Sequence, residues 1–211
     1  MTAGAAIGAC SASPASPRPD ESESESAERS GTPAPGTRTV LLAYFSRPGE
    51  NYYNGGRRNI EVGNTEVLAR MIADRTDCDV HRIRAADPYP SGYDATVRRN
   101  VREQDTEARP AVADPLVSLG RYDTILLGSP VWNVRAPMIM TTFTETLDFR
   151  GRTVVPFTTH AMSGLGTTAR DYAASCPGAT IAEGLAVRGE EVRDAGAAVD
   201  AWLRRIGLPA S

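Results

Sequence analysis

Three apolar runs in this chain each end in a small, polar loop, and a helix-like stretch follows each loop. The runs span residues 39–45, 124–128 and 153–157, and each loop starts at the next residue, which bears a hydroxyl group. Near-continuous apolar runs of this length are typical of parallel strands that are buried on both faces. Because ligands of open α/β sheets bind beyond the carboxyl ends of the strands, the three loops are expected to meet at one site.

The rest of the chain continues this alternation of strands and helices. Two further strands are predicted at residues 79–84 and 180–187. Helices are predicted at residues 64–75, 93–107, from near 137, 165–175 and 190–206. The charged helix at 93–107 is expected to lie over the sheet edge. Five strands that alternate with helices predict right-handed βαβ connections, and therefore a three-layer α/β/α sandwich without a second domain.

The first 37 residues differ from the remainder of the chain. They are rich in Ala, Ser, Pro and Glu and lack the hydrophobicity that offsets the entropy of ordering, so we interpret residues 1–37 as a disordered tether. Five acids against two arginines give the tether a charge of −3, which equals the formal net charge of the chain. Residues 38–211 are therefore electrically balanced, and no nucleic-acid partner is expected.

The residues Ile-Gly-Ala-Cys that end at Cys10 resemble the cleavage box of a bacterial lipoprotein signal, without its basic segment and most of its apolar segment. Two interpretations stay open. One is an ordinary flexible terminus on a cytoplasmic protein. The other is a signal shortened by a misassigned start, which would make an extracytoplasmic lipoprotein anchored through Cys10. No run of 18 apolar residues is present, so no transmembrane segment is predicted.

Composition excludes several chemistries. All 23 basic residues are arginine, whereas P-loop NTPases and pyridoxal enzymes each need a lysine. Three cysteines and two histidines show no metal-ligand spacing, so no metal site is expected. Gly164 and Gly166 do not enclose the serine of a nucleophile elbow, and we assign no catalytic residue.

The first loop has the groups that bind an anion. Ser46 ends the first apolar run, and Asn64 and Thr65 open the helix that follows. Free backbone N–H groups and the positive end of the helix dipole favour phosphate there, without a lysine. The alternative is that Ser46 only ends a strand and that Asn64 only caps a helix.

The second and third loops suit a flat heterocycle. Trp132 follows the third strand and would lie at the mouth of the crevice, where an indole can stack on a flat, apolar ligand. The third loop, residues 158–164, offers backbone donors and acceptors to the edge of such a ring. His160 is its one candidate base.

These segments together carry a family resemblance. Residues 38–208 resemble the flavodoxin-like family. The matching segments are Ala-Tyr-Phe-Ser-Arg at 43–47, Gly-Asn-Thr at 63–65, Ser-Pro-Val-Trp at 129–132 and the loop at 158–164. The resemblance implies one noncovalent FMN and the strand order 2-1-3-4-5. Because the fifth strand shows no long interruption, residues 38–211 resemble the short-chain type.

The resemblance also implies which residues contact FMN. The first loop and the helix start would hold the phosphate, the second loop would flank the ring with Trp132 as the stacking partner, and the third loop would line the pyrimidine edge. The complete set is Ser46, Arg47, Pro48, Asn64, Thr65, Ser129, Pro130, Val131, Trp132, Asn133, Thr159, His160, Ser163 and Gly164.

Two features depart from the usual flavodoxin pattern. Residues 49–62 separate Ser46 from the helix start, and Asn54-Gly55 favours a hairpin that covers the phosphate or presents residues 52–58 to a partner. The alternative is a solvated loop. The domain is also neutral, with Arg47 and Arg135 near the site. This should raise the flavin reduction potential relative to acidic flavodoxins.

Three functional hypotheses follow. The first is an FMN-binding protein that carries electrons to a redox partner protein or a small redox substrate. The second is an NAD(P)H-dependent quinone-type reductase, in which a second flat molecule stacks over the flavin. The third, from another class, is a flavin-free sensor or adaptor on the same fold.

Overall fold

The computed structural model describes residues 39–113 and 115–208, so the predicted tether and Cys10 lie outside the described residues. Its main sheet is entirely parallel, in the order β4-β1-β5-β6, and both β7 and β8 pair with β6. The strands are β1 (Val40–Phe45), β4 (Asp79–Ile83), β5 (Thr124–Pro130), β6 (Thr153–His160), β7 (Thr180–Ile181) and β8 (Leu185–Arg188). Since β4 is the second predicted strand, the order 2-1-3-4-5 is confirmed.

The fifth strand, predicted at residues 180–187 with no long interruption, is divided into β7 and β8 by the short segment 182–184. Val154 pairs with Ile181 and Phe157 pairs with Leu185, so the fifth strand has one residue more than β6 across this interval. Pro156 of β6 lies opposite the break and has no N–H to donate to the ladder. The extra residue is therefore accommodated as a bulge where the ladder is already interrupted.

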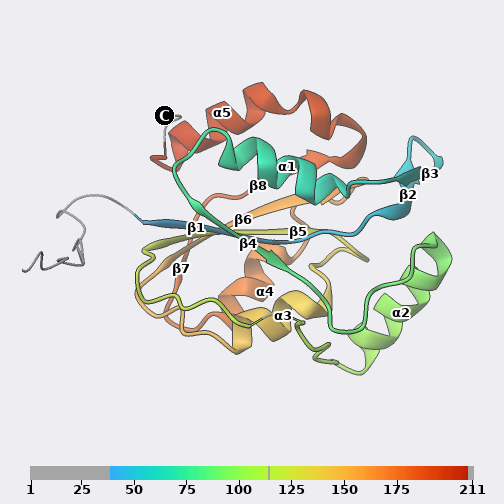
Figure 1. Cartoon of the computed structure of the whole chain (residues 1–211), viewed down its shortest axis with the longest axis horizontal. Coiled ribbons are helices and arrows are strands. Elements are labelled where there is room, and N and C mark those ends of the chain that lie inside the picture. The colour runs from blue at the N-terminus through green and yellow to red at the C-terminus, as the bar shows by residue number, and fades with distance from the viewer. Residues whose placement is uncertain (1–38, 114, 209–211) are drawn as a thin grey trace, which may run out of the picture. The chain divides into compact units, whose positions relative to one another are not determined.

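Helices cover both faces of the sheet, which confirms the three-layer sandwich (Figure 1). Side chains of β1 alternate between the layers: Leu42 packs toward α1 and α5, and Leu41 packs toward α3 and α4. The covering elements are α1 (Asn64–Ala73), η1 (Gly189–Asp194) and α5 (Gly196–Arg205) on one face, and α3 (Met138–Glu145) and α4 (Thr168–Ser175) on the other.

The helices predicted at 64–75 and 93–107 each end two residues early, at Ala73 and Asp105, and two other helices differ at their start. The helix predicted at 190–206 is divided into η1, a 3₁₀ helix, and α5, as is common at a helix start. The helix predicted at 165–175 begins only at Thr168, because Gly166 has a φ of 53°, outside the right-handed helical region.

The predicted hairpin is confirmed. β2 (Gly49–Tyr53) and β3 (Gly56–Ile60) form an antiparallel pair, joined by Asn54 and Gly55 with φ values of 47° and 84°. Two consecutive positive φ values are what a type I′ turn requires, and Asn-Gly adopts them at low cost.

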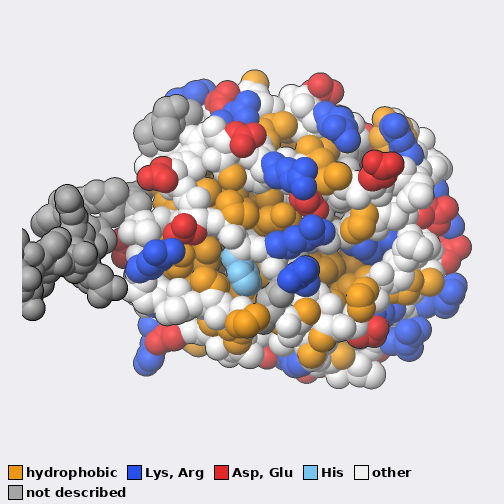
Figure 2. Space-filling view, viewed as in Figure 1, with side chains coloured by type: hydrophobic (Ala, Val, Ile, Leu, Met, Phe, Trp, Pro, Cys, Tyr) orange, Lys and Arg blue, Asp and Glu red, His pale blue; other side chains and the backbone are white. Residues whose placement is uncertain are grey.

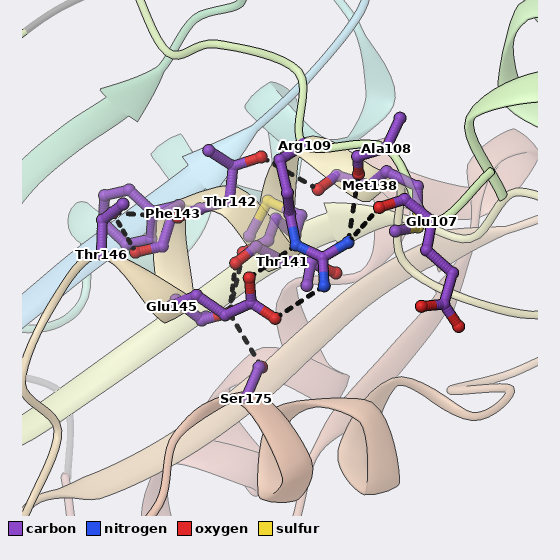
Figure 3. A network of polar contacts seen from close by, with 12 residues as sticks. Glu107, Ala108, Arg109, Met138, Thr141, Thr142, Phe143, Glu145, Thr146 and Ser175 are labelled. Carbon is purple, nitrogen blue, oxygen red and sulfur yellow. Dashed lines mark hydrogen bonds and ion pairs between the residues drawn. The ribbon is translucent and has the colours of Figure 1, made fainter.

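Contrary to the prediction, helix α2 (Tyr93–Asp105) does not lie over the sheet edge. It lies beyond the carboxyl ends of the strands, where it packs against β2 and α3 (Figure 1). The segment after it is clamped to α3, because the Arg109 guanidinium binds both carboxylate oxygens of Glu145 at 2.5 and 2.8 Å (Figure 3). The polar residues that α2 buries could not cover an apolar strand, which explains why it is not part of the sandwich.

The surface of the described domain mixes both signs of charge with apolar side chains on the face that Figure 2 presents. This agrees with the charge balance of residues 38–211. Among the described helices, none is both long enough and apolar enough to cross a membrane.

Candidate functional site

A cavity of about 340 Å³ opens at the carboxyl ends of β1, β5 and β6, bordered by the start of α1, by α2 and by the β2–β3 hairpin. The structure thus brings the three strand-end loops together, as the sequence predicts. Of the fourteen residues predicted to bind the cofactor, ten line this cavity. They are Ser46, Arg47, Asn64, Thr65, Pro130, Val131, Trp132, Asn133, Thr159 and His160.

The other four predicted residues do not line the cavity. Pro48 is exposed on a neighbouring groove, and Ser163 is exposed to solvent. Ser129 is fully buried, with its hydroxyl 3.5 Å from that of Tyr172, because alternation along β5 turns it away from the cavity. The Gly164 carbonyl accepts a hydrogen bond from the Thr158 hydroxyl, so this glycine holds the loop after β6 closed and does not line the cavity.

The start of α1 presents a cluster of polar groups. The Ser46 hydroxyl accepts a hydrogen bond from the Glu66 N–H at 3.0 Å, and the hydroxyls of Thr65 and Thr159 lie 2.7 Å apart. Within the described part of the chain, no acceptor lies within hydrogen-bond reach of the backbone N–H groups of Asn64 and Thr65. These free donors, at the positive end of the helix dipole, suit an anionic group.

A buried carboxylate in the same helix turn is neutralised by arginines. The Glu66 side chain is only 7% exposed, yet it forms ion pairs with Arg70 and, at 3.1 Å, with Arg82. Burial, followed by the charge of Glu66, raises the pKa of the neighbouring Tyr44 hydroxyl. The carboxylate therefore does not present an unbalanced negative charge to these N–H donors.

Arg47 lines the cavity, and its two terminal guanidinium nitrogens bind the protein backbone. It donates to the carbonyls of Pro90 at 3.0 Å and Ser91 at 2.9 Å, and also to the carbonyl of Glu50. Burial lowers the pKa of this side chain. Arg47 thus fixes the loop before α2 against β2 through its two terminal nitrogens, while its Nε is buried without a partner among the described residues.

Trp132 lies in an aromatic cluster at the cavity wall. Its ring makes edge-to-face contacts with Phe45 and Tyr89, at centroid distances of 5.8 and 5.1 Å. The Trp132 carbonyl accepts a hydrogen bond from Gln104 of α2 at 3.1 Å, and Gln104 in turn accepts one from Asn133. Two aromatic rings therefore hold the indole, α2 holds the Trp132 backbone, and the residue lines the cavity.

Sequence reasoning missed the contribution of α2 to the site. Tyr93, Thr96, Val97, Asn100 and Val101 line the cavity, as do Asn51, Tyr52, Ala161 and Gly189. One sequence signal could have revealed this contribution of α2. Two valines four residues apart on an otherwise charged helix form an apolar strip, which indicates a contact with another apolar surface.

His160 is expected to contribute to the pH dependence of folding. Burial, followed by the charge of Arg188, lowers its pKa, and its Nδ1 is buried without a hydrogen-bond partner among the described residues. Below the ordinary value of about 6.5 the unfolded chain binds a proton that the folded chain does not, so stability falls as the pH drops from 6.5 to the lowered pKa. In His160→Gln this loss should disappear, as measured by urea unfolding between pH 5 and 7.5. Equal pH slopes in the two proteins would contradict the assignment.

Neither described cysteine is poised for redox chemistry. Burial raises the pKa of Cys78 to about 11 and that of Cys176 to about 12, so both stay protonated at neutral pH. Across residues 39–113 and 115–208, no group of three or more metal-ligating side chains could hold an ion.

Comparison with known proteins places the chain in a family. The flavodoxin family model matches residues 59–206, more than half of the chain, and the protein therefore belongs to the flavodoxin family. The family and the three-layer sheet together define the class as a flavodoxin-like α/β protein. No curated protein matches it in a sequence search.

Solved structures extend this comparison. A candidate flavoprotein from Bacteroides eggerthii DSM 20697 is 29% identical, with a TM-score of 0.65 over 81% of this chain and 98% of its own. A second candidate flavoprotein, from Bacteroides uniformis ATCC 8492, is also 29% identical, with a TM-score of 0.62 over 79% and 98%. A flavoprotein from Lactobacillus acidophilus NCFM, solved in complex with FMN, shares the fold at 17% identity, with a TM-score of 0.54 over 76% and 99%.

Proposed function

We propose that this protein carries electrons by means of a noncovalently bound FMN in the cavity at the carboxyl ends of β1, β5 and β6. One observation carries the proposal: free N–H groups and hydroxyls at the start of α1 share a cavity with Trp132 and the end of β6. This combination suits a ligand with an anionic group and a flat ring. Membership of the flavodoxin family and the FMN complex of the Lactobacillus relative support FMN as the cofactor.

The described residues fit FMN by chemical type. The backbone N–H groups of Asn64 and Thr65, with the Thr159 hydroxyl, would hold its phosphate. Trp132 and Val131 would contact the ring, and the backbone near His160 would face its pyrimidine edge. When bound, FMN supplies reversible uptake of electrons.

The chain itself would bind FMN, exclude water from it and set its potential. Burial keeps His160 neutral at pH 7, so its free Nδ1 can accept a hydrogen bond or, as the other tautomer, donate one. The cavity wall contains no carboxylate among the described residues, and Arg47 lies within it. A positive, carboxylate-free wall favours a reduced, anionic flavin, and the reduction potential should therefore exceed that of an acidic flavodoxin.

A second candidate function is an NAD(P)H-dependent quinone-type reductase. The observation that favours it is the apolar strip of Val97 and Val101, which is partly exposed and lines the same cavity as the loops assigned to FMN. Steady-state turnover with NAD(P)H and a quinone distinguishes the two candidates, because a pure electron carrier needs a separate protein reductase.

Flavin retention tests the proposed function directly. After reconstitution with FMN and desalting, the full-length protein should keep the visible flavin absorption bands. In Trp132→Ala the bands should shift and FMN should bind about tenfold more weakly, because a stacked aromatic contact of about 1 kcal/mol or more is lost. Trp132→Phe is the control and should retain most of the affinity. A wild-type protein that desalts colourless would contradict the proposal and favour a flavin-free sensor or adaptor.

A further inference from the structure

Helix α2 is turned the opposite way from an ordinary surface helix. Its buried residues are polar, namely Thr96, Asn100 and Glu103, while Val97 and Val101 are 43% and 39% exposed. Amphipathic helices normally bury the apolar strip and expose the polar one. Large apolar side chains left exposed beside a cavity indicate a binding surface more readily than scattered exposed residues do.

The polar face of α2 has partners inside the protein, which explains this orientation. Glu103 accepts a hydrogen bond from the Tyr89 hydroxyl at 2.7 Å and one from Arg99 at 2.7 Å. The Thr96 hydroxyl donates to the Pro90 carbonyl at 2.9 Å. Because a buried polar group that loses its partner destabilises the fold, rotating α2 to bury the valines would be unfavourable.

Both ends of α2 are fixed as well. At its start, Arg57 of the hairpin binds Asp94 through two hydrogen bonds at 2.6 and 2.9 Å. Near its end, Gln104 donates to the Trp132 carbonyl. The valines are therefore presented to the cavity by a helix that is anchored along its length.

The wall around these valines suits an uncharged, flat ligand. Val97 and Val101 line the same cavity as Trp132 and Tyr52. Arg47 is the one permanently charged side chain among the described residues of the lining. Its two terminal guanidinium nitrogens bind backbone carbonyls, and its Nε is buried without a partner among the described residues. No charged group in the described lining is thus exposed for pairing with an ionic substituent on a second ligand.

We propose that the Val97–Val101 surface of α2 binds the second substrate of the cavity, a flat, uncharged aromatic molecule of the quinone type. This inference rests on the proposed function, since the first occupant is FMN. Reduction of the quinone to the hydroquinone would consume two electrons from the reduced cofactor and two protons, supplied by the cofactor and solvent. The contribution of α2 is to hold the ring by apolar contact and to exclude water from it.

The test uses the double variant Val97→Thr/Val101→Thr, which keeps the side-chain shapes but replaces one methyl group of each valine by a hydroxyl. The first measurement is the dissociation constant of 2-methyl-1,4-naphthoquinone on the oxidised, FMN-loaded full-length protein, followed by the change in flavin absorbance. Oxidised flavin does not reduce a quinone, so binding alone is observed. The second measurement is the dissociation constant of FMN on the apoprotein.

The quinone dissociation constant should rise at least fivefold in the double variant, while that of FMN changes less than twofold. Val80→Thr is the matched control, because Val80 is 54% exposed on β4 and lies outside the cavity lining; it should change neither constant. Equal rises in both constants would mean that the valines contact FMN itself and would overturn the inference. Unchanged quinone binding, or none by the wild-type FMN-loaded protein, would also overturn it while leaving the proposed function intact. A wild-type protein that binds no FMN would instead refute the proposed function.

Discussion

Replacing Gly63 by alanine should weaken FMN binding by about two orders of magnitude, equivalent to about 2.7 kcal/mol. A Cβ at Gly63 would lie 2.3 Å from the Ser46 hydroxyl oxygen and 2.6 Å from the Arg47 carbonyl oxygen. Ser46 must then move away from the start of α1, and the hydrogen bond that its hydroxyl accepts from the Glu66 N–H is lost. Because binding sites tolerate only displacements of about 0.5 Å, the cluster of polar groups at the start of α1 should lose the geometry that FMN binding needs. Titration of the apoprotein with FMN, followed by flavin fluorescence, measures the effect.

Gly92→Ala is the matched control for this substitution. Gly63 and Gly92 each precede a helix and have nearly the same backbone conformation, with φ of −64° and −78° and ψ of 146° and 142°. A Cβ at Gly92 would have no neighbour within 4 Å, so alanine should leave FMN affinity unchanged. If Gly63→Ala binds FMN as tightly as Gly92→Ala does, the phosphate is not held at the start of α1.

Replacing Gly128 by alanine should lower the free energy of unfolding by about 3 kcal/mol, the upper range for overpacking a core. Gly128 of β5 pairs with Phe157 of β6, and the phenyl ring lies across the glycine. An added Cβ would lie 2.0 Å from Cζ of that ring, and Phe157 is fully buried, so the ring has little room to move. Urea unfolding of the apoprotein, monitored by circular dichroism, gives the change.

Two further variants isolate the steric cause. Gly120→Ala adds the same methyl group at an exposed glycine, where the nearest atom, a serine hydroxyl oxygen, lies 3.7 Å away, and stability should change by less than about 0.5 kcal/mol. Gly128→Ala combined with Phe157→Leu should cost less than the sum of the two single changes, because leucine removes the overlapping ring atoms. Additive losses would show that the ring does not account for the damage.

The geometry of the site depends on a chain of contacts that begins in α2. Glu103 binds the Tyr89 hydroxyl, and the Tyr89 ring packs against Trp132. Burial, followed by the hydrogen bond to Glu103, raises the pKa of Tyr89, so its hydroxyl stays protonated and can donate. The position of the proposed stacking residue is therefore set by a helix that sequence reasoning placed elsewhere.

The sheet, the hairpin and the edge of the sheet where the candidate site lies could be predicted from the amino-acid sequence. The apolar run at 40–45 alternates between two buried layers, Asn54-Gly55 forms the predicted turn, and loops after β1, β5 and β6 meet in one cavity. These features follow from periodicity and turn chemistry within a few residues, together with the rule that parallel strands end at the same edge.

The details that depend on polar partners distant in the sequence could not be predicted and are seen only in the folded structure. Arg47 bonds to carbonyls more than 40 positions along the chain, and α2 buries Glu103 because the Tyr89 hydroxyl and Arg99 complete its hydrogen bonds. The direction of the Ser129 side chain, toward Tyr172 and not toward the cavity, likewise depends on the register of this residue in β5. A local pattern shows which side chains are polar, but only the packed fold shows which of them find a buried partner and which are left to face a ligand.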